Sequence, residues 1–272
     1  MKRGAALIGV VVALAMSAAA CGSGGGTPAV SIKTLQAAVS NTQDVASERF
    51  TMTISVEAAG EHVDIDADGV ASGDGKTLQL TMTLPTLGSI EARLVDNVMY
   101  MDFGDLGALG GKLPEGKRWV SIDLDALQSQ AGGGVGSLID QTRNSGPTQG
   151  LEYLQGLSGD VTKVGDDTVA GEHATHYRAS IDYAKVAAEL PNTSADVAEK
   201  LAKLGTVPAD VWIDDQDRVV KMHFSIDGSA LGTGAGSTDL TMVITDFGVP
   251  VDVQAPPADE TVDLASLGAV PA

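Results

Sequence analysis

Cys21 is the residue whose chemistry is easiest to assign, because it is the only cysteine in a chain of 272 residues. Small residues at 17–20 precede it, as they precede the cleavage point of exported precursors. Before them lies Gly4–Met16, an apolar stretch that follows two positive residues and is shorter than the roughly 20 residues needed to span a bilayer. We predict that residues 1–20 are a lipoprotein signal peptide and that Cys21 is acylated after its removal.

Two other interpretations of this N-terminus stay open. Cleavage without acylation would release a soluble protein, and an uncleaved signal would itself act as an anchor. The cleavage motif also has Ala18 where lipoproteins usually carry Leu. Acylation is favoured because a sole cysteine at the cut site would otherwise be a coincidence. Residues 21–30, rich in Gly, are then a lipidated flexible tether. The domain that follows is expected to be exported and lipid-anchored to the outer face of the cytoplasmic membrane.

The remaining polar residues do not match a known catalytic or metal-binding pattern. The sequence has no G-x-S-x-G, P-loop or H-E-x-x-H motif. His173 and His176 are three residues apart in an expected strand, so they face opposite sides and make a poor metal pair. Asp64–Gly69 resembles the start of a calcium loop, but its twelfth position is Gly75, where a bidentate Glu is required. We therefore expect no enzyme activity, no cofactor and no metal site.

The charge balance excludes some classes of partner. Loss of residues 1–20 removes two basic residues and no acidic ones, which leaves 15 Lys and Arg against 36 Asp and Glu, a formal charge of −21. Nucleic acids and anionic membrane surfaces select basic proteins, so we expect neither as a partner. Aromatic residues make up only 4% of the chain, so the core is expected to consist mainly of aliphatic side chains.

Alternation of apolar and polar residues predicts a series of antiparallel strands. A helix is expected first, over Ser31–Val45, with Ser31 as its N-cap. Strands follow, with breaks at Gly, Asn or Asp, over residues 50–58, 62–70, 77–84, 90–95, 98–103 and 118–124. Helical pieces are then expected in residues 125–157.

The second half repeats this order only loosely. Two helices are expected over Tyr183–Leu190 and Ser194–Leu204, and the tail from Pro250 has little periodicity. Strands are expected over residues 161–166, 172–181, 209–213, 218–227 and 238–247, with Asp214–Asp217 as a polar turn. Together the elements predict an α+β fold, in which one curved antiparallel sheet carries helices on its apolar face, in a single domain over residues 31–272.

Five short motifs in the second half occur in an order that resembles one family. They are Val164–Gly171, His176–Ala179, Val211–Asp214, Arg218–Met222 and Thr245–Val251. Behind a lipoprotein signal, this order resembles the actinobacterial LppX/LprA/LprF/LprG-type lipoproteins, whose fold is akin to that of the lipoprotein carrier LolA. The resemblance implies a half-barrel of antiparallel strands, with helices packed on its concave face and an apolar cavity between the two layers.

The same resemblance implies a function. It implies binding of an acylated lipid or glycolipid in the cavity and its movement from the plasma membrane toward the outer envelope, without enzyme activity. An envelope transporter would be a further partner, and the protein is expected to be a monomer. Candidate residues for the cavity are the apolar residues expected on the inner face: Met52, Ile54, Val56, Ile65, Leu78, Leu80, Met82, Leu94, Met99, Met101, Phe103, Leu138, Leu154, Met222, Phe224, Ile226, Leu240, Met242 and Ile244.

A second interpretation is a non-transporting surface lipoprotein that acts as a sensor or as a protein-interaction scaffold. It predicts a dry core and an exposed apolar patch. From the residues alone an ordinary core is favoured, because Met commonly fills irregular gaps between packed side chains. The family resemblance favours a cavity instead.

We predict that Cys21→Ala moves the protein from the membrane fraction to the soluble fraction, because the substitution removes the only acylation site. Fractionation of cells followed by immunodetection measures this distribution. If the variant stays with the membranes, the proposed anchor is wrong.

Overall fold

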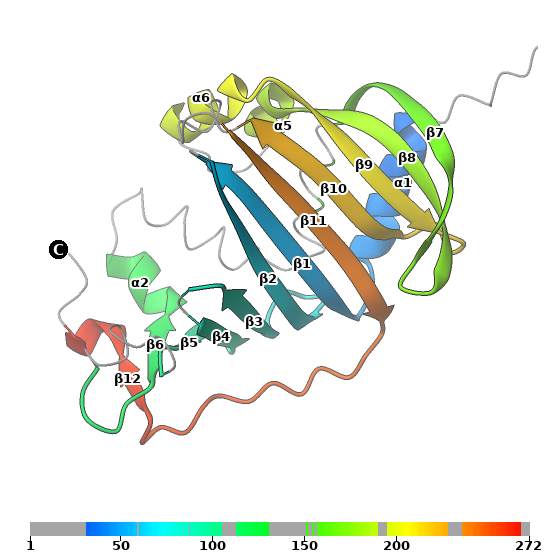
Figure 1. Cartoon of the computed structure of the whole chain (residues 1–272). Coiled ribbons are helices and arrows are strands. Elements are labelled where there is room, and N and C mark those ends of the chain that lie inside the picture. Colours follow the sequence, from blue (N-terminus) through cyan, green and yellow to red (C-terminus); the bar gives the residue numbers. More distant parts are fainter. Residues whose placement is uncertain are drawn as a thin grey trace, which may run out of the picture.

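One sheet of twelve strands forms the centre of the computed structural model, in the order β12-β6-β5-β4-β3-β2-β1-β11-β10-β9-β8-β7. The sheet is curved and open, and the few helices lie against one of its faces or at its ends (Figure 1). The structure describes residues 31–58, 60–86, 88–104, 113–130, 151, 154, 157–189, 195–227 and 236–267.

The strands form two antiparallel meanders. In each meander, strands that follow one another in sequence are also neighbours in the sheet. The first meander consists of β1 (Ser47–Ala58), β2 (Glu61–Ser72), β3 (Leu78–Leu84), β4 (Gly88–Val95), β5 (Val98–Asp102) and β6 (Trp119–Asp123). The second consists of β7 (Leu157–Val169), β8 (Glu172–Asp182), β9 (Thr206–Asp214), β10 (Val219–Asp227) and β11 (Gly236–Phe247).

The two meanders become one sheet because β1, the first strand, pairs with β11, near the end of the chain. Their pairing runs from Glu48 opposite Phe247 to Ala58 opposite Gly236, with an irregularity between Arg49 and Phe50. It keeps the period-two pattern in phase across the junction, since apolar Met52 lies opposite apolar Met242. The apolar faces of both meanders are therefore continuous.

Two of the hairpins use turns that match the right-handed twist of strands. Asp96 and Asn97 between β4 and β5 have φ values of 50° and 66°. Ala170 and Gly171 between β7 and β8 have φ values of 51° and 90°. Two consecutive residues with positive φ are the geometry of a type I′ turn, which favours tight hairpins.

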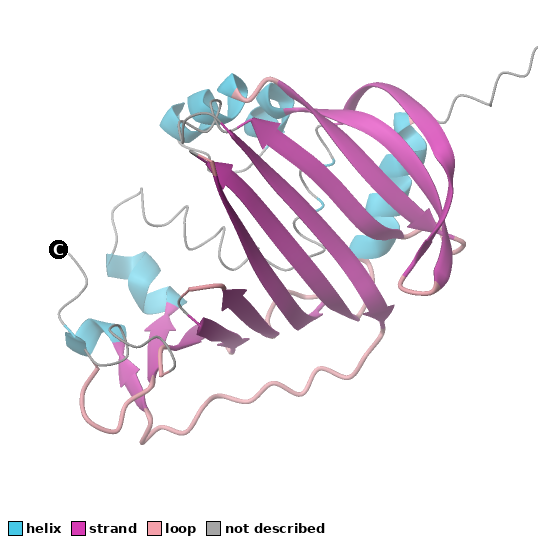
Figure 2. Ribbon diagram, viewed as in Figure 1, coloured by secondary structure: helices cyan, strands magenta, loops and turns pink. Residues whose placement is uncertain are grey.

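The helices among the described residues are few and short. They are α1 (Ile32–Gln43), α2 (Leu124–Gln130), α5 (Tyr183–Glu189), α6 (Ala195–Lys203) and the 3₁₀ turn η3 (Leu264–Leu267). Figure 2 shows strands β7–β10 curving around α1. Helix α1 buries Leu35, Ala38 and Val39 at helical spacing, and these side chains join the core beneath the second meander.

The predicted fold class is confirmed. The predicted helix Ser31–Val45 corresponds to α1, and Ser31 is its N-cap residue, although its side chain makes no capping bond. Eleven strands predicted from alternation are present, and several extend beyond the predicted ends; β7, for example, covers Leu157–Val169 where 161–166 was expected. Of residues 125–157, where helical pieces were predicted, the structure describes only residues 125–130, which belong to α2, and residues 151, 154 and 157.

The C-terminal tail holds an element that alternation did not predict. β12 (Thr261–Asp263) pairs parallel to β6 at the sheet edge. Three residues are too few to show a period, so this strand depends on its neighbour and on the tail before it. Figure 1 shows that tail running from β11 to β12 along the sheet. Arg93 Nη1 donates to the carbonyl of Gln254, and Lys117 Nζ donates to the carbonyl of Asp259, 2.8 Å away.

The buried hydroxyl of Thr42 links α1 to strand β10 of the second meander. Thr42 Oγ1 accepts a hydrogen bond from the backbone N–H of Val219 at 2.7 Å and donates to the carbonyl of Ala38. Thr42→Val should lower the free energy of unfolding in urea by about 1–3 kcal/mol, because it leaves a buried donor unpaired.

The matched control is Ser40→Ala. Ser40 Oγ also donates to the carbonyl four residues before it, that of Gln36, but Ser40 is exposed and this bond lies within α1. Its loss should change the free energy of unfolding by less than about 0.5 kcal/mol. Equal effects of the two substitutions would show that the Thr42–Val219 bond does not stabilise the fold.

Candidate functional site

The inner face of the sheet is apolar across at least six strands. Residues that pair directly in an antiparallel sheet place their side chains on the same face. The strand pairings therefore align one transverse row of aliphatic side chains, from β10 to β4: Met222, Met242, Met52, Ala67, Met82 and Ile90.

Parallel rows extend this face on both sides. One side carries Phe224, Leu240, Ile54 and Ile65 on β10, β11, β1 and β2. The other side carries Ile244, Phe50, Gly69, Leu80, Ala92, Met101 and Val120 on strands β11 to β6. Gly69 has no side chain because the ring of Phe50 occupies that space; a Cβ there would lie 2.6 Å from the ring.

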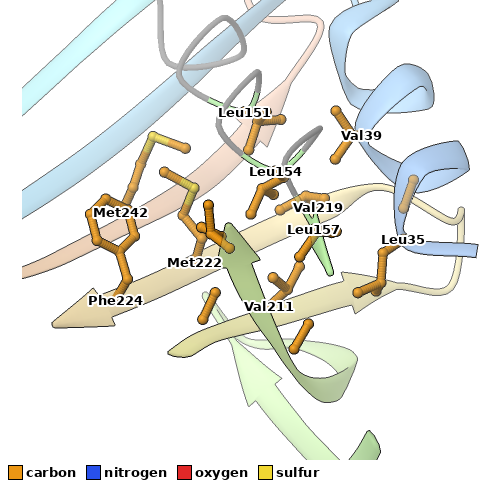
Figure 3. Packing of buried hydrophobic residues seen from close by; sticks show 14 of the residues in the cluster. Leu35, Val39, Leu151, Leu154, Leu157, Val211, Val219, Met222, Phe224 and Met242 are labelled. Carbon is orange, nitrogen blue, oxygen red and sulfur yellow. The ribbon is translucent and has the colours of Figure 1, made fainter. Parts of the chain in front are cut away.

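The largest core covers the second-meander part of this face. Leu35 and Val39 of α1 pack with Leu151, Leu154 and strand residues of β7, β9 and β10 (Figure 3). Met222, Phe224 and Met242 belong to the same cluster and are each less than a tenth exposed. Here the inner face is closed by protein.

A smaller core covers the other end of the face. Leu124 of α2 is buried with Phe50, Leu78 and Leu94, and Leu80, Met99, Ile122 and Leu127 pack partly buried against it. Helix α2 thus closes the β3–β6 end of the apolar face, as α1 closes the β7–β10 end.

Between the two cores lies a stretch of the inner face that belongs to neither. We call it the central tract and define it by six residues: Met52, Ile54, Val56, Ile65, Met82 and Ile90. All six are half-buried, and none belongs to a hydrophobic cluster of the described residues. Aliphatic side chains left partly accessible in a concave sheet are a typical lining for an apolar ligand.

The candidate residues predicted from the sequence fall into three groups. Met52, Ile54, Val56, Ile65 and Met82 lie in the central tract. A second group lies in the two cores or packs against them: Leu78, Leu80, Leu94, Met99, Leu154, Met222, Phe224, Ile226, Leu240, Met242 and Ile244. Met101 is half-buried beside Val120, Phe103 is half-buried just after β5, and Leu138 and Cys21 lie outside the described residues. Contact of any of them with a lipid stays a prediction.

Two residues of the same face were not among the predicted candidates. Ile90 completes the row that contains Met82, and Val63 pairs with Val56 at the end of the β1–β2 hairpin. Both alternate in phase with candidates on their own strands, Ile90 with Leu94 and Val63 with Ile65. The alternation alone was therefore a sufficient signal.

The outer face is polar, and its acidic residues take structural roles. Asp64 accepts a hydrogen bond from Ser55 at 2.6 Å, and Asp66 accepts one from Thr53 at 2.9 Å, so the calcium-like sequence is the exposed side of β2. Asp214 accepts bonds from the backbone N–H groups of Gln216 and Arg218, as expected for a polar turn. Among the described residues, no group of three or more His, Cys, Asp or Glu could hold a metal ion.

An aromatic and charged cluster covers the outer face of the second meander. Trp212 is stacked on His176, with ring centroids 4.2 Å apart, and Lys221 Nζ lies 4.3 Å from the Trp212 ring. The indole N–H donates to Asp167 at 2.9 Å. His176 pairs with Asp210, whereas His173 pairs with Asp215, so the two histidines are separate, as predicted.

The part of the chain that the structure describes includes no helix that is both long and apolar enough to cross a membrane. The fold and the central tract together define a class of protein: an open antiparallel half-barrel with helices packed on an apolar concave face.

Comparisons with known proteins place this chain in a family. It is 31% identical over 258 residues to an uncharacterized 31.2 kDa protein in the rplA–rplJ intergenic region of Streptomyces griseus, a match that covers 89% of this chain and 80% of that protein. The chain therefore belongs to the family of that Streptomyces protein. It is also 28% identical over 225 residues to a Streptomyces coelicolor protein named as a lipoprotein, over 78% of this chain and 69% of that protein. No family model matches the chain.

Solved structures include two mycobacterial lipoproteins that are similar to this chain. LppX of Mycobacterium tuberculosis aligns with a TM-score of 0.49 and 15% identity, over 82% of this chain and 97% of LppX. LprF of Mycobacterium bovis aligns with a TM-score of 0.47 and 17% identity, over 83% of this chain and 96% of LprF. The resemblance predicted from the sequence motifs is confirmed.

Asp210 on the outer face gives a pH-dependent prediction. Burial raises the pKa of Asp210, but the hydrogen bonds from Arg178 and His176 outweigh burial and hold its pKa below the ordinary 3.8. A carboxyl with a lowered pKa in the folded state stabilises the fold above its unfolded pKa. That contribution is lost as the pH falls through the folded-state pKa.

Asp210→Asn should therefore lower the free energy of unfolding by about 1–2 kcal/mol at pH 7, and the difference from wild type should shrink as the pH falls below 3.8, toward the lowered pKa of Asp210. Urea titrations across this range measure it. Asp215→Asn is the control, because the His173–Asp215 pair is exposed and should contribute little at any pH. A difference for Asp210→Asn that does not shrink as the pH falls below 3.8 would contradict the proposed ionic role.

Proposed function

We propose that this protein is an exported lipoprotein, anchored through acyl groups on Cys21, that binds the acyl chains of a lipid or glycolipid on the central tract and carries the lipid from the plasma membrane toward the outer envelope. The observation that carries this proposal is the central tract itself. Six aliphatic side chains from four adjoining strands stay half-buried between two closed cores.

The energetics of lipid transfer supply the reason for such a tract. Each CH₂ group costs about 0.8 kcal/mol to expose to water, so a sixteen-carbon chain faces roughly 12 kcal/mol on leaving a membrane. Covering that chain against aliphatic side chains recovers much of this cost. Flexible Met side chains adapt to chains of different shape, and Met52 and Met82 both belong to the tract.

The relatives and the charge pattern also support the proposal. A family relative in Streptomyces coelicolor is named as a lipoprotein, which agrees with the predicted acylation of Cys21. A mature chain with a formal charge of −21 is repelled by anionic headgroups, so the domain would stay in solution beside the membrane that its anchor holds. We propose a binding function and no catalysis.

Bound lipid provides the direct test. The chain should be purified from a host envelope with Cys21→Ala, so that its own acyl groups do not contribute, then extracted with organic solvent and analysed by mass spectrometry. We expect acylated lipid in a fixed ratio to protein. Repeated absence of lipid would contradict the proposal and favour a surface scaffold.

A substitution pair tests the tract itself. Met82→Gln places a polar amide on the central tract and should weaken binding of a fluorescent fatty-acyl probe about tenfold, since an apolar contact is replaced by an unpaired polar group. Thr81→Gln, on the next residue and the opposite face, should leave binding unchanged. Equal effects of both substitutions would place the lipid elsewhere.

A further inference from the structure

All the sulfur in residues 31–272 belongs to methionine, because the only cysteine of the chain is Cys21. The methionines of this domain are all on the inner face of the sheet. Four of them share the transverse row of side chains that starts on β10, and two lie on β5, opposite Leu94 and Ala92. They are Met222, Met242, Met52, Met82, Met99 and Met101. Any reaction of sulfur in this domain therefore changes the apolar face.

The methionines of the row differ in how far they are covered. Met222 and Met242, which we call the core methionines, are each 4% exposed and belong to the larger core (Figure 3). Met52 and Met82, which we call the tract methionines, are half-buried and belong to neither core. One row of the sheet thus holds the same thioether group in a covered form and in an accessible form.

The tract methionines lie on either side of Ala67. The register pairs Ala67 with Met52 on β1 and with Met82 on β3. The side chain of Ala67 is a single methyl group, and it is 6% exposed between its two longer neighbours. Two accessible thioethers therefore stand beside one short side chain, on the surface where we propose that hydrocarbon binds. Met101 is also half-buried, but it lies on β5, outside the central tract.

We propose that Met52 and Met82 form an oxidation site, at which a two-electron oxidant such as hydrogen peroxide makes the empty central tract polar and so prevents it from taking up hydrocarbon. This inference rests on the proposed lipid binding. The sulfur takes one oxygen atom from the peroxide and forms an S=O bond. The O–O bond breaks, water leaves, and the two electrons that sulfur loses reduce the peroxide. Methionine sulfoxide reductases return the sulfoxide to the thioether, so the change is reversible.

The polarity of a sulfoxide is the reason for the effect on binding. Its oxygen accepts hydrogen bonds from water, and an alkyl chain that covers it offers no donor, which costs free energy. A thioether carries no such cost and adapts to the shape of the chain that it contacts. A domain exported as proposed works outside the reducing cytosol, where its thioethers meet oxidants. A bound acyl chain covers the tract methionines, so the reaction acts on the empty protein.

Peptide mass spectrometry tests the site directly. The delipidated Cys21→Ala chain is treated with limiting hydrogen peroxide, and the sulfoxide at each methionine is measured over time. We expect the tract methionines to oxidise about five times faster, or more, than the core methionines, because access of the oxidant follows exposure. A saturating fluorescent fatty-acyl probe should slow oxidation of the tract methionines and leave that of the core methionines unchanged. Equal rates at all four positions would overturn the inference.

The effect on binding is tested with paired substitutions in the Cys21→Ala background. The measured quantity is the Kd of the acyl probe after peroxide divided by its Kd before, so a change that a substitution itself makes to binding cancels. Without further substitution this ratio should be about ten or more, and methionine sulfoxide reductases should reverse it. Met52→Leu with Met82→Leu removes the accessible sulfur at similar volume and should hold the ratio at about one.

The matched control is Met222→Leu with Met242→Leu. It makes the same chemical change twice in the same row of the sheet, but at covered positions, so the ratio should stay at about ten or more. A ratio of about one in this control would place the sensitive sulfur in the core and overturn the inference.

The outcomes separate this inference from the function on which it rests. If the untreated chain binds no acyl probe, lipid binding is wrong and the inference falls with it. If the untreated chain binds the probe but peroxide leaves its Kd unchanged, lipid binding stands and the oxidation site is overturned. The same holds if Met52→Leu with Met82→Leu loses binding after peroxide as strongly as the chain that keeps both methionines.

Discussion

The pairing of β1 with β11 is the interaction on which the rest of the structure depends. It joins residues almost two hundred positions apart and turns two local meanders into one sheet. Closing so long a loop costs conformational entropy, which the run of backbone bonds and the Phe50–Ile244 and Met52–Met242 contacts offset. Without this pairing the apolar inner face would be two separate strips, because the row from Met222 to Ile90 crosses the junction between the meanders.

The alternation of apolar and polar residues along the strands makes one face of the sheet aliphatic and the other polar. The inner face is aliphatic and is closed by α1 at one end and α2 at the other. The outer face carries carboxylates and hydroxyls that bond to one another, together with Trp212 held between His176 and Lys221. An acidic outer face and an apolar inner face suit a domain that stays in water while it shelters hydrocarbon, which is the function proposed for it.

Most strands were predictable because their pattern is local. Residues 62–68 and 77–84 alternate strictly, and the register of β2 and β3 places Ala67 opposite Met82 as a shared face requires. β12 was not predictable, because its three residues carry no pattern and pair with β6 only after the tail has crossed the sheet. Met242 and Leu154 were predicted as cavity residues, and both lie in the larger core, because a local apolar pattern cannot tell a closed core from an open tract.

The sequence by itself determined the lone acylation site expected at Cys21, the strongly acidic balance and the apolar identity of one face of each strand. These properties depend on residue type and short-range spacing, which folding does not alter. Only the tertiary structure decided which apolar residues are covered. Met52 and Met222 have the same chemistry and lie in one row, but α1 and its neighbours cover the β10 end of that row and leave the β1 end half-accessible. Coverage is set by contacts between segments far apart in the chain, and no local pattern records them.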